Sequence, residues 1–123
     1  MGRIVVDTNV LWDAGALLRL QESGRPLVLP AVAFAERARQ FKARGWSLQS
    51  LWKILEKVGL VVEPLGPVEA VRFAMDLQDN QHWARLSRDA FIAGHVGPGD
   101  TLWTRDVEDF VAVGVPRGQI VAI

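Results

Sequence analysis

The chain has 123 residues, half of them hydrophobic, and its 14 basic residues balance its 14 acidic ones. This length and apolar content suit one domain with a single filled core and exclude a disordered chain, so we expect one domain over residues 1–123. Because the net charge is zero, a nucleic-acid partner would have to be held by a local basic patch.

The chain has no cysteine, which excludes disulfides and thiolate zinc sites and is typical of a reducing compartment. No apolar run approaches the roughly 20 residues of a membrane span, and no signal peptide precedes the first strand. We therefore expect a cytoplasmic protein without a membrane partner.

Strands and helices alternate along the first half of the chain, as the spacing of apolar residues and the positions of Ser, Gly and Pro indicate. In chain order we expect a strand over 3–6, a helix with Val10, Leu11, Ala14, Leu17 and Leu18 on its apolar side, a strand over 26–29, a helix over 31–44, and a helix capped by Ser47 that stops near Gly59.

The second half continues the alternation. We expect a strand over 60–63, a helix from Pro67 through Met75, a short helix capped by Ser87 through Ala93, a strand over 101–104, a helical turn over 107–110 and a strand over 119–122. Strands separated by helices pair in parallel through right-handed crossovers, with helices on both faces. The sequence therefore predicts an α/β fold, a three-layer α/β/α sandwich.

Acidic residues recur where the chain leaves the strands of this predicted sheet. Asp7 ends the first strand, and Glu36 lies in the second turn of the helix after the second strand. Asp89 is in the first turn of its expected helix, and Asp106 comes two residues past the fourth strand. Because parallel strands end at one edge and the helices begin there, we expect these acids to meet at the edge where open α/β sheets bind ligands.

Four carboxylates in one cleft repel one another, and their pKa values rise unless a cation relieves the repulsion. An all-oxygen acidic site suits Mg²⁺ or Mn²⁺, which keep several waters and often bridge to a substrate phosphate. The pattern therefore predicts a divalent metal site.

Each of these acids also has a purely structural interpretation. The first helix could be capped by Asp7, Thr8 or Asn9, and Asp89 and Asp106 lie where a cap or the helix dipole favours an acid. Glu36 lies too deep in its helix to cap it, and its structural alternative is a partly buried pair with Arg39 or Gln40. The placement of all four at one edge is what favours a site.

Four segments, IVVDTNVL, LPAVAFAERARQF, LSRDAFIAGHV and LWTRDVEDF, resemble the motifs of PIN-domain ribonucleases in order and spacing. Within that superfamily the chain is most similar to VapC-type toxins of toxin–antitoxin pairs. The resemblance implies a central five-stranded parallel sheet in the order 3-2-1-4-5. By the same resemblance the catalytic, metal-binding acids are Asp7, Glu36, Asp89 and Asp106, supported by Thr8, Asn9 and Thr104.

The activity implied by the resemblance is an endoribonuclease that hydrolyses RNA phosphodiester bonds with Mg²⁺ or Mn²⁺. The implied partners are an RNA substrate, a cognate antitoxin protein and a second copy of the chain in a homodimer. Arg85, Arg88 and Arg105 flank the acids and are candidates for contacts with RNA phosphates. Their alternative is pairing with nearby acids, namely Asp89, Asp106 or Glu108.

Two features depart from the family pattern. Gly94 and the run GPG at 97–99 cut short the helix after Asp89, which leaves Asp100 and Asp109 as weaker candidates for the fourth acid. The same departure keeps open an alternative function, a noncatalytic PIN-like binding or scaffold module.

The tryptophans carry expectations of their own. Trp52 lies on an apolar helical face and is expected in the core, whereas Trp12 or Trp46 is expected to contact the antitoxin or the second copy. We expect His82 and His95 in surface or loop positions. The solvated face of the second helix is expected to carry Arg37, Arg39, Lys42 and Arg44.

Overall fold

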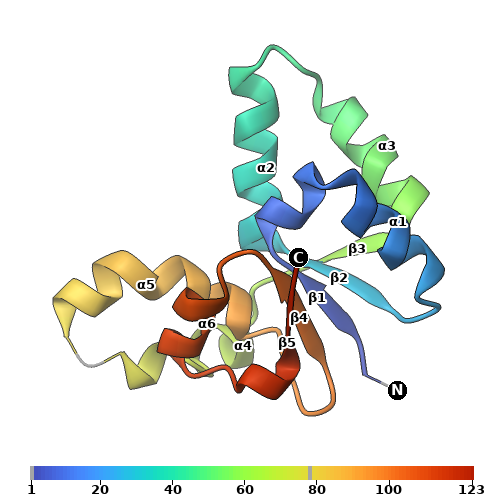
Figure 1. Cartoon of the computed structure of the whole chain (residues 1–123). Helices are drawn as coiled ribbons and strands as arrows, with labels where there is room; N and C mark the ends of the chain where they lie inside the picture. Colours follow the sequence, from blue (N-terminus) through green and yellow to red (C-terminus); the bar gives the residue numbers. More distant parts are fainter. Residues whose placement is uncertain (1, 78) are drawn as a thin grey trace.

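The computed structural model describes residues 2–77 and 79–123. Five parallel strands form one sheet in the order β3-β2-β1-β4-β5, which confirms the three-layer α/β/α sandwich (Figure 1). In the central strand, Ile4 pairs with Leu27 on one side and with Thr101 on the other. The strands are β1 (Ile4–Val6), β2 (Leu27–Pro30), β3 (Leu60–Glu63), β4 (Thr101–Thr104) and β5 (Ile120–Ala122).

The helices fill the connections between the strands. They are α1 (Ala14–Glu22), α2 (Ala31–Ala43), α3 (Leu48–Val58), α4 (Pro67–Val71), α5 (Asn80–Ala93) and α6 (Val107–Val113), with the short 3-10 helices η1 (Thr8–Trp12), η2 (Ala74–Asp76) and η3 (Arg117–Gln119). Within the described residues, no helix has the length and apolarity needed to cross a lipid bilayer.

The connections explain the two helical layers. The chain moves outward from β1 through β2 to β3, then returns to β4 beside β1 and moves outward again to β5. Because right-handed crossovers in opposite directions place helices on opposite faces, α1 to α3 lie on one side of the sheet and α4 to α6 on the other (Figure 1). The helices α2 and α3 form a pair that extends beyond the sheet (Figure 1).

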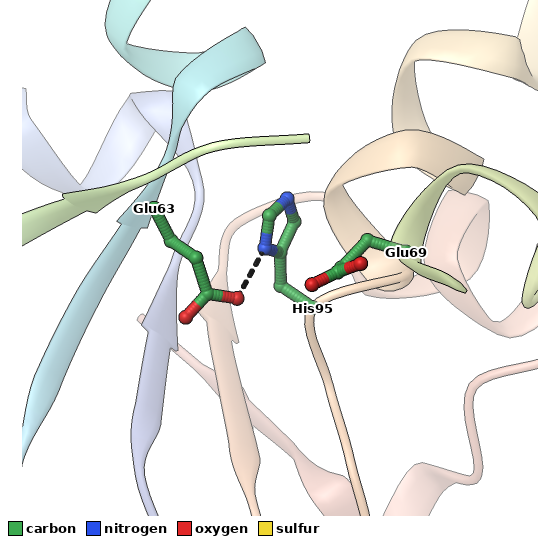
Figure 2. A group of neighbouring side chains, drawn as sticks. All are labelled: Glu63, Glu69 and His95. Atoms are coloured by element: carbon green, nitrogen blue, oxygen red, sulfur yellow. Dashed lines mark hydrogen bonds and ion pairs between the residues drawn. The ribbon is translucent and has the colours of Figure 1, made fainter. Parts of the chain in front are cut away.

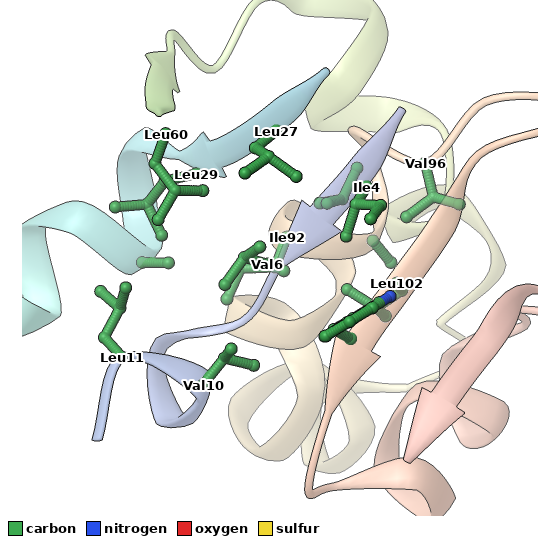
Figure 3. Close-up of a cluster of buried hydrophobic side chains, with 14 of the residues drawn as sticks. Ile4, Val6, Val10, Leu11, Leu27, Leu29, Leu60, Ile92, Val96 and Leu102 are labelled. Atoms are coloured by element: carbon green, nitrogen blue, oxygen red, sulfur yellow. The ribbon is translucent and has the colours of Figure 1, made fainter. Parts of the chain in front are cut away.

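The core explains why the strands are continuous apolar runs in the sequence. Both faces of the sheet are covered, so successive residues of a strand are buried on both sides. Val5 and Val6 of β1 have no exposed surface, nor do Leu29 of β2 and Leu102 of β4. Ile92 of α5 reaches the same cluster (Figure 3). The buried central strand thus places the residues that follow it in the middle of the carboxyl edge.

The first expected helix is split in the structure. After η1, Asp13 caps a separate helix, α1, by accepting a hydrogen bond from the Ala16 N–H at 3.0 Å. The expected apolar stripe is therefore wrong for α1, because its buried residues are Ala16 and Leu20 whereas Leu18 is exposed. The break at Asp13 changes the helical phase between the two segments.

Two later helices differ in length from expectation. The helix expected from Pro67 through Met75 ends at Val71, and η2 follows it as a separate short turn. The helical turn after β4 is longer than expected and continues through Val113 before Gly114 ends it with a positive φ.

The helix that carries Asp89 begins well before the expected cap at Ser87. It starts at Asn80, and the carboxylate of Asp79 accepts a hydrogen bond from the His82 N–H at 2.8 Å. The expectation was wrong because the first turns of α5 are exposed and carry no apolar stripe. Asp89 therefore lies in the third turn of α5, beyond the reach of a helix cap or of the dipole at its N-terminus.

Gly94 ends α5 where α4 approaches it closely. A Cβ built on Gly94 would lie 1.8 Å from the carbonyl oxygen of Glu69. The φ of Gly94 is −56°, so its backbone suits alanine, which is usually about 1 kcal/mol more favourable than glycine in a helix. We nevertheless expect Gly94→Ala to lower the free energy of unfolding by about 1–3 kcal/mol, because the helices must separate. Urea denaturation measures this change.

Gly118→Ala is the control for that experiment, because a Cβ built on Gly118 has no neighbour within 4 Å. Its free energy of unfolding should stay within about 0.5 kcal/mol of the parent value. Equal stabilities for the two variants would contradict the close approach of α4 to α5.

Candidate functional site

Asp7 stands at the end of the central strand with no exposed surface. Its Oδ1 accepts a hydrogen bond from the Thr8 N–H at 2.7 Å, so Asp7 does cap η1. Its Oδ2 accepts a hydrogen bond from the hydroxyl of Thr104, at the end of the neighbouring strand β4, at 2.8 Å. A cap needs one carboxylate oxygen, whereas both oxygens of Asp7 are held, and this fixes the orientation of the carboxylate.

Asp7, Glu36 and Asp89 converge on the guanidinium of Arg88. The Nη2 of Arg88 lies 3.1 Å from Asp7 Oδ1. Its Nε donates to Glu36 Oε1, and its Nη1 donates to Asp89 Oδ1. The Thr8 hydroxyl joins the group, since it accepts from Arg88 at 3.3 Å and donates to Glu36 at 3.5 Å. The end of β1, α2 and α5 thus each contribute an acid to one cluster at the carboxyl edge.

The acids of this cluster outnumber its cation. Burial by itself would lower the pKa of Arg88, but the carboxylates of Asp7, Glu36 and Asp89 outweigh burial and raise that pKa above its usual value. Burial raises the pKa of Asp89 to about 6; Arg88 opposes this rise, and the charge of Asp7 adds to it. Because three carboxylates share one guanidinium, the cluster attracts further positive charge.

The fourth expected acid, Asp106, lies at the rim and is exposed. Its backbone N–H donates to Thr104 Oγ1 at 2.9 Å, and its carboxylate accepts from Asn9 Nδ2 at 3.0 Å. Asp106 makes no side-chain cap bond to α6, so the capping interpretation finds no support for this residue. Thr104, which also holds Asp7, and Asn9 connect Asp106 to the end of β1.

The two weaker candidates for the fourth acid lie in different places. Asp100 precedes β4 and accepts hydrogen bonds from the backbone N–H groups of Arg3 and Gly97, both at 2.8 Å, so it belongs to the opposite edge of the sheet. Asp109 lies in the first turn of α6, 3.5 Å from Arg85 of α5, and its charge contributes to the raised pKa of Asp89.

A second group of ionisable side chains is more tightly gathered. Among the described residues, only Glu63, Glu69 and His95 form a group of acids and histidines whose ligand atoms all lie within 4.8 Å of one another (Figure 2). The oxygens around Arg88 lie outside that limit, because each bonds a different nitrogen of the guanidinium that stands between them.

Arg3 already supplies the cation of this second group. One oxygen of Glu63 bonds Nδ1 of His95 at 2.7 Å, and the other forms an ion pair with Arg3. Burial alone would raise the pKa of Glu63, but the bonds from His95 and Arg3 outweigh it and lower that pKa. Because both oxygens of Glu63 are occupied, we assign this group a structural role that joins β3 to the turn after α5.

The two histidines differ from each other in exposure. His82 is exposed on α5, as expected. His95 lies in the turn after α5, which agrees with the expected surface or loop position, but its side chain is buried. Its Nε2 has no hydrogen-bond partner among the described residues.

The arginines that flank the acids are all paired. Arg88 makes the three contacts described above, whereas Arg85 lies 3.5 Å from Asp109 and Arg105 lies 3.3 Å from Asp13. The side chains of Arg85 and Arg105 remain half exposed, so these two cations still face solvent beside the cluster.

Aromatic rings gather at the end of α2. The ring of Trp12 lies 6.0 Å from that of Trp46 and 6.4 Å from that of Phe41. Arg37 packs over Trp12 and is buried, so its expected solvated position is wrong. Burial and the neighbouring charge of Arg44 lower the pKa of Arg37 to about 10. Apolar packing of its stem and stacking of its head explain the burial.

The exposed tryptophans follow the expectation only in part. Trp12 and Trp46 keep 38% and 46% of their surface exposed, so a partner contact there stays a prediction. Trp52, expected in the core, is 40% exposed and packs on Phe34 at the surface of α3. That expectation was wrong because Trp52 faces Phe34 of α2, with ring centroids 4.9 Å apart, and lies outside the buried core cluster.

Comparisons of the chain with protein-family models, with curated proteins and with solved structures find no significant match. The functional assignment therefore depends on the residues and their geometry.

The sequence alone leaves the role of Arg88 open between contact with RNA and pairing with a neighbouring acid. The dipeptide Arg88–Asp89 is the only local signal, and the contact with Asp7 spans 81 residues. A contact between residues so far apart in the chain leaves no local pattern in the sequence.

Proposed function

We propose that this chain is a divalent-metal-dependent endoribonuclease of the PIN type and the toxin of a VapBC-type toxin–antitoxin pair. The observation that carries the proposal is the convergence of Asp7, Glu36 and Asp89 on one cation at the carboxyl edge of the sheet. Open α/β sheets bind their ligands at this edge. The segments that resemble PIN ribonuclease motifs contain these same residues and Asp106.

The chemistry of the donor set suits Mg²⁺ or Mn²⁺. All of its side chains offer carboxylate oxygens, which these ions prefer, and a cation already lies among them. Asp7, Glu36 and Asp89 would hold the metal, with Asp106 beside them at the rim. Such an ion lowers the pKa of water and neutralises charge that develops on phosphate oxygens.

The surrounding residues orient these ligands. The Thr104 hydroxyl fixes Asp7 at 2.8 Å, and Asn9 holds Asp106 at 3.0 Å. Partners of this kind fix the orientation of metal ligands and affect metal affinity in known sites. The half-exposed Arg85 and Arg105 are the cations placed to contact RNA phosphates, which provides the local patch that a chain of zero net charge requires.

The proposed reaction adds water across a P–O bond of RNA. The water oxygen bonds to phosphorus, the bond to the leaving oxygen breaks, and that oxygen ends with a proton. None of these steps needs a histidine as a general acid or base. This agrees with the structure, in which His82 pairs with Asp79 and His95 pairs with Glu63, and neither forms an ion pair or hydrogen bond with the acids around Arg88.

The proposed partners are RNA, an antitoxin and a second copy of the chain, in the cytoplasm. An apolar hollow of about 370 Å³ lies between α1 and α3 and supports a protein partner. Its lining includes Leu17, Leu18, Ile54 and Val58, and Leu18 is exposed. Trp12, at the end of η1, and Trp46, which follows α2, are partly exposed and offer a second apolar surface for a partner.

A noncatalytic PIN-like binding module is the second candidate. The ion pairs of Arg88 favour it, because a guanidinium that neutralises Asp7, Glu36 and Asp89 permanently would make the acids a structural network. The two candidates differ in one readout, the cleavage of RNA.

Metal binding gives the first test of the proposal. We expect millimolar Mg²⁺ or Mn²⁺ to raise the melting temperature, because a ligand that binds only the folded chain stabilises it by mass action. Structured RNA should be cleaved in the same buffer, and EDTA should stop the cleavage. Differential scanning fluorimetry and gel analysis of labelled RNA measure the two effects.

Calcium is the control ion for this test. It should bind the carboxylates and raise the melting temperature but support cleavage poorly, because its coordination geometry is looser than that of Mg²⁺. Cleavage that persists in EDTA, or no cleavage with any of these ions, would contradict the proposed function.

A further inference from the structure

The Arg88 side chain occupies the same carboxylate oxygens that a metal would use. Its three nitrogens each bond one acid, and the acceptors are Asp7 Oδ1, Glu36 Oε1 and Asp89 Oδ1. The oxygens lie too far apart to surround one ion in this arrangement. The spacing of the three oxygens therefore matches the three nitrogens of a guanidinium. A metal ion is smaller, so the oxygens must move closer together to bind it.

Arg88 and a divalent cation cannot share these oxygens at low cost. Like charges at contact distance repel strongly in a partly buried site, where solvent screens them poorly. The Asp7 carboxylate offers no alternative free oxygen, because its Oδ2 is taken by the Thr104 hydroxyl and its Oδ1 also accepts the Thr8 N–H. Entry of a metal thus competes directly with Arg88.

The position of Arg88 permits its release. The residue lies in α5 one position before Asp89, and 36% of its side chain is exposed, so the head group can turn to solvent while the helix stays in place. We propose that Arg88 is an internal counter-ion that holds the acids together without metal and that a divalent cation must displace. This inference rests on the proposed metal site and adds a residue that opposes metal binding.

The test compares metal affinity in two variants of α5. Arg88→Gln removes the competing charge and keeps a polar side chain. Arg85→Gln is the matched control, because Arg85 lies on the same helix and pairs with Asp109 outside the three-acid contact. Calorimetric titration with MnCl₂, without RNA, measures the dissociation constants.

We expect Arg88→Gln to bind Mn²⁺ about tenfold more tightly than the parent chain, which corresponds to one charge-assisted hydrogen bond that no longer has to be broken. Arg85→Gln should match the parent within about twofold. Without metal, Arg88→Gln should melt at a lower temperature than the parent, and Mn²⁺ should raise its melting temperature more. An unchanged or weaker Mn²⁺ affinity in Arg88→Gln overturns the inference.

A second measurement uses the unmodified chain, so the inference can be tested even if the Arg88→Gln variant does not fold. The Nε–H of Arg88 donates to Glu36, so its NMR resonance should be protected from solvent exchange without metal. Titration with MgCl₂ should remove this protection while leaving that of the Arg25 Nε–H, which donates to the carbonyl oxygen of Gly2, unchanged. Protection of Arg88 that persists at saturating Mg²⁺ overturns the inference.

RNA cleavage separates this inference from the proposed function. If the parent chain cleaves RNA but Arg88→Gln shows no gain in Mn²⁺ affinity, the counter-ion role fails and the ribonuclease proposal stands. If the variant gains affinity but neither chain cleaves RNA, the counter-ion role stands and the ribonuclease proposal fails. If neither chain binds Mn²⁺ at millimolar concentration, both fail.

Discussion

Asp89→Asn is expected to abolish metal-dependent RNA cleavage and, at the same time, to stabilise the metal-free fold. Loss of one anionic ligand should lower the cleavage rate by roughly 10²–10³-fold, the effect of removing one preorganised electrostatic group from an active site. Asparagine keeps the shape of aspartate and an oxygen that accepts from Arg88. Cleavage of labelled RNA and urea denaturation in EDTA measure the two outcomes.

The gain in stability should depend on pH. Burial raises the pKa of Asp89 to about 6 in the folded chain, above the value of about 3.9 in an unfolded one. The folded chain therefore binds this proton more tightly, and the fold loses stability through Asp89 as pH rises from about 4 to about 6. The variant escapes that loss, so its advantage should grow over this range and then level off at up to about 1 kcal/mol, allowing for screening.

Asp76→Asn, at an exposed position in η2, is the control for both readouts and should change stability by no more than about 0.5 kcal/mol. If Asp89→Asn cleaves RNA at the parent rate, Asp89 is not part of the site. If the variant is less stable than the parent at pH 7, the charge of Asp89 does not destabilise the fold, and this prediction is wrong.

Asp7→Asn should also abolish cleavage, but we expect it to destabilise the fold by about 1.5–3 kcal/mol. Both carboxylate oxygens of Asp7 are buried and accept hydrogen bonds, from the Thr8 N–H and from the Thr104 hydroxyl. An amide has one oxygen, so its NH₂ group would face one of these donors. Arg88 would also lose one of its three partners. Urea denaturation at pH 7 in EDTA measures the loss.

The contrast between the two substitutions distinguishes a carboxylate that is destabilised by burial and nearby negative charge, Asp89, from one that is stabilised by hydrogen bonds, Asp7. Asp89→Asn should increase stability and Asp7→Asn should reduce it, although each removes one negative charge from the same cluster. Thr104→Ser keeps the hydroxyl and is the control for Asp7, and it should retain both cleavage and most of the stability. Equal effects of the two asparagine variants on stability would contradict the hydrogen bonding of Asp7.

Three of the acids were predictable because their positions follow from local rules. Asp7 directly follows one apolar strand and Asp106 comes two residues after another, both at one edge of a parallel sheet. Glu36 lies in the helix that begins after Pro30 at the end of a strand. Asp89 was placed correctly at that edge for the wrong reason, since it lies in the third turn of α5 and not the first. The exposed first turns of α5 contain no periodicity that marks a helix.

The partners of ionisable side chains were the least predictable feature. Arg37 was expected in solvent but is buried over Trp12, and His95 lies in a loop as expected, but its burial and its bond to Glu63 were not predicted. In each case the partner lies on another part of the chain, and hydrophobic spacing describes only the element on which a residue itself lies. The direction of a charged head group depends on neighbours that the spacing does not reveal.

The sequence by itself determined the sheet, its order by resemblance, and the edge at which Asp7, Glu36, Asp89 and Asp106 appear. It did so because apolar runs, breakers and right-handed crossovers are properties of short segments and of their succession. Only the tertiary structure decided that Arg88 lies between the acids and that both oxygens of Asp7 are held. These contacts join β1, α2, α5 and β4, and packing of the core, not the order of residues, brings those elements together.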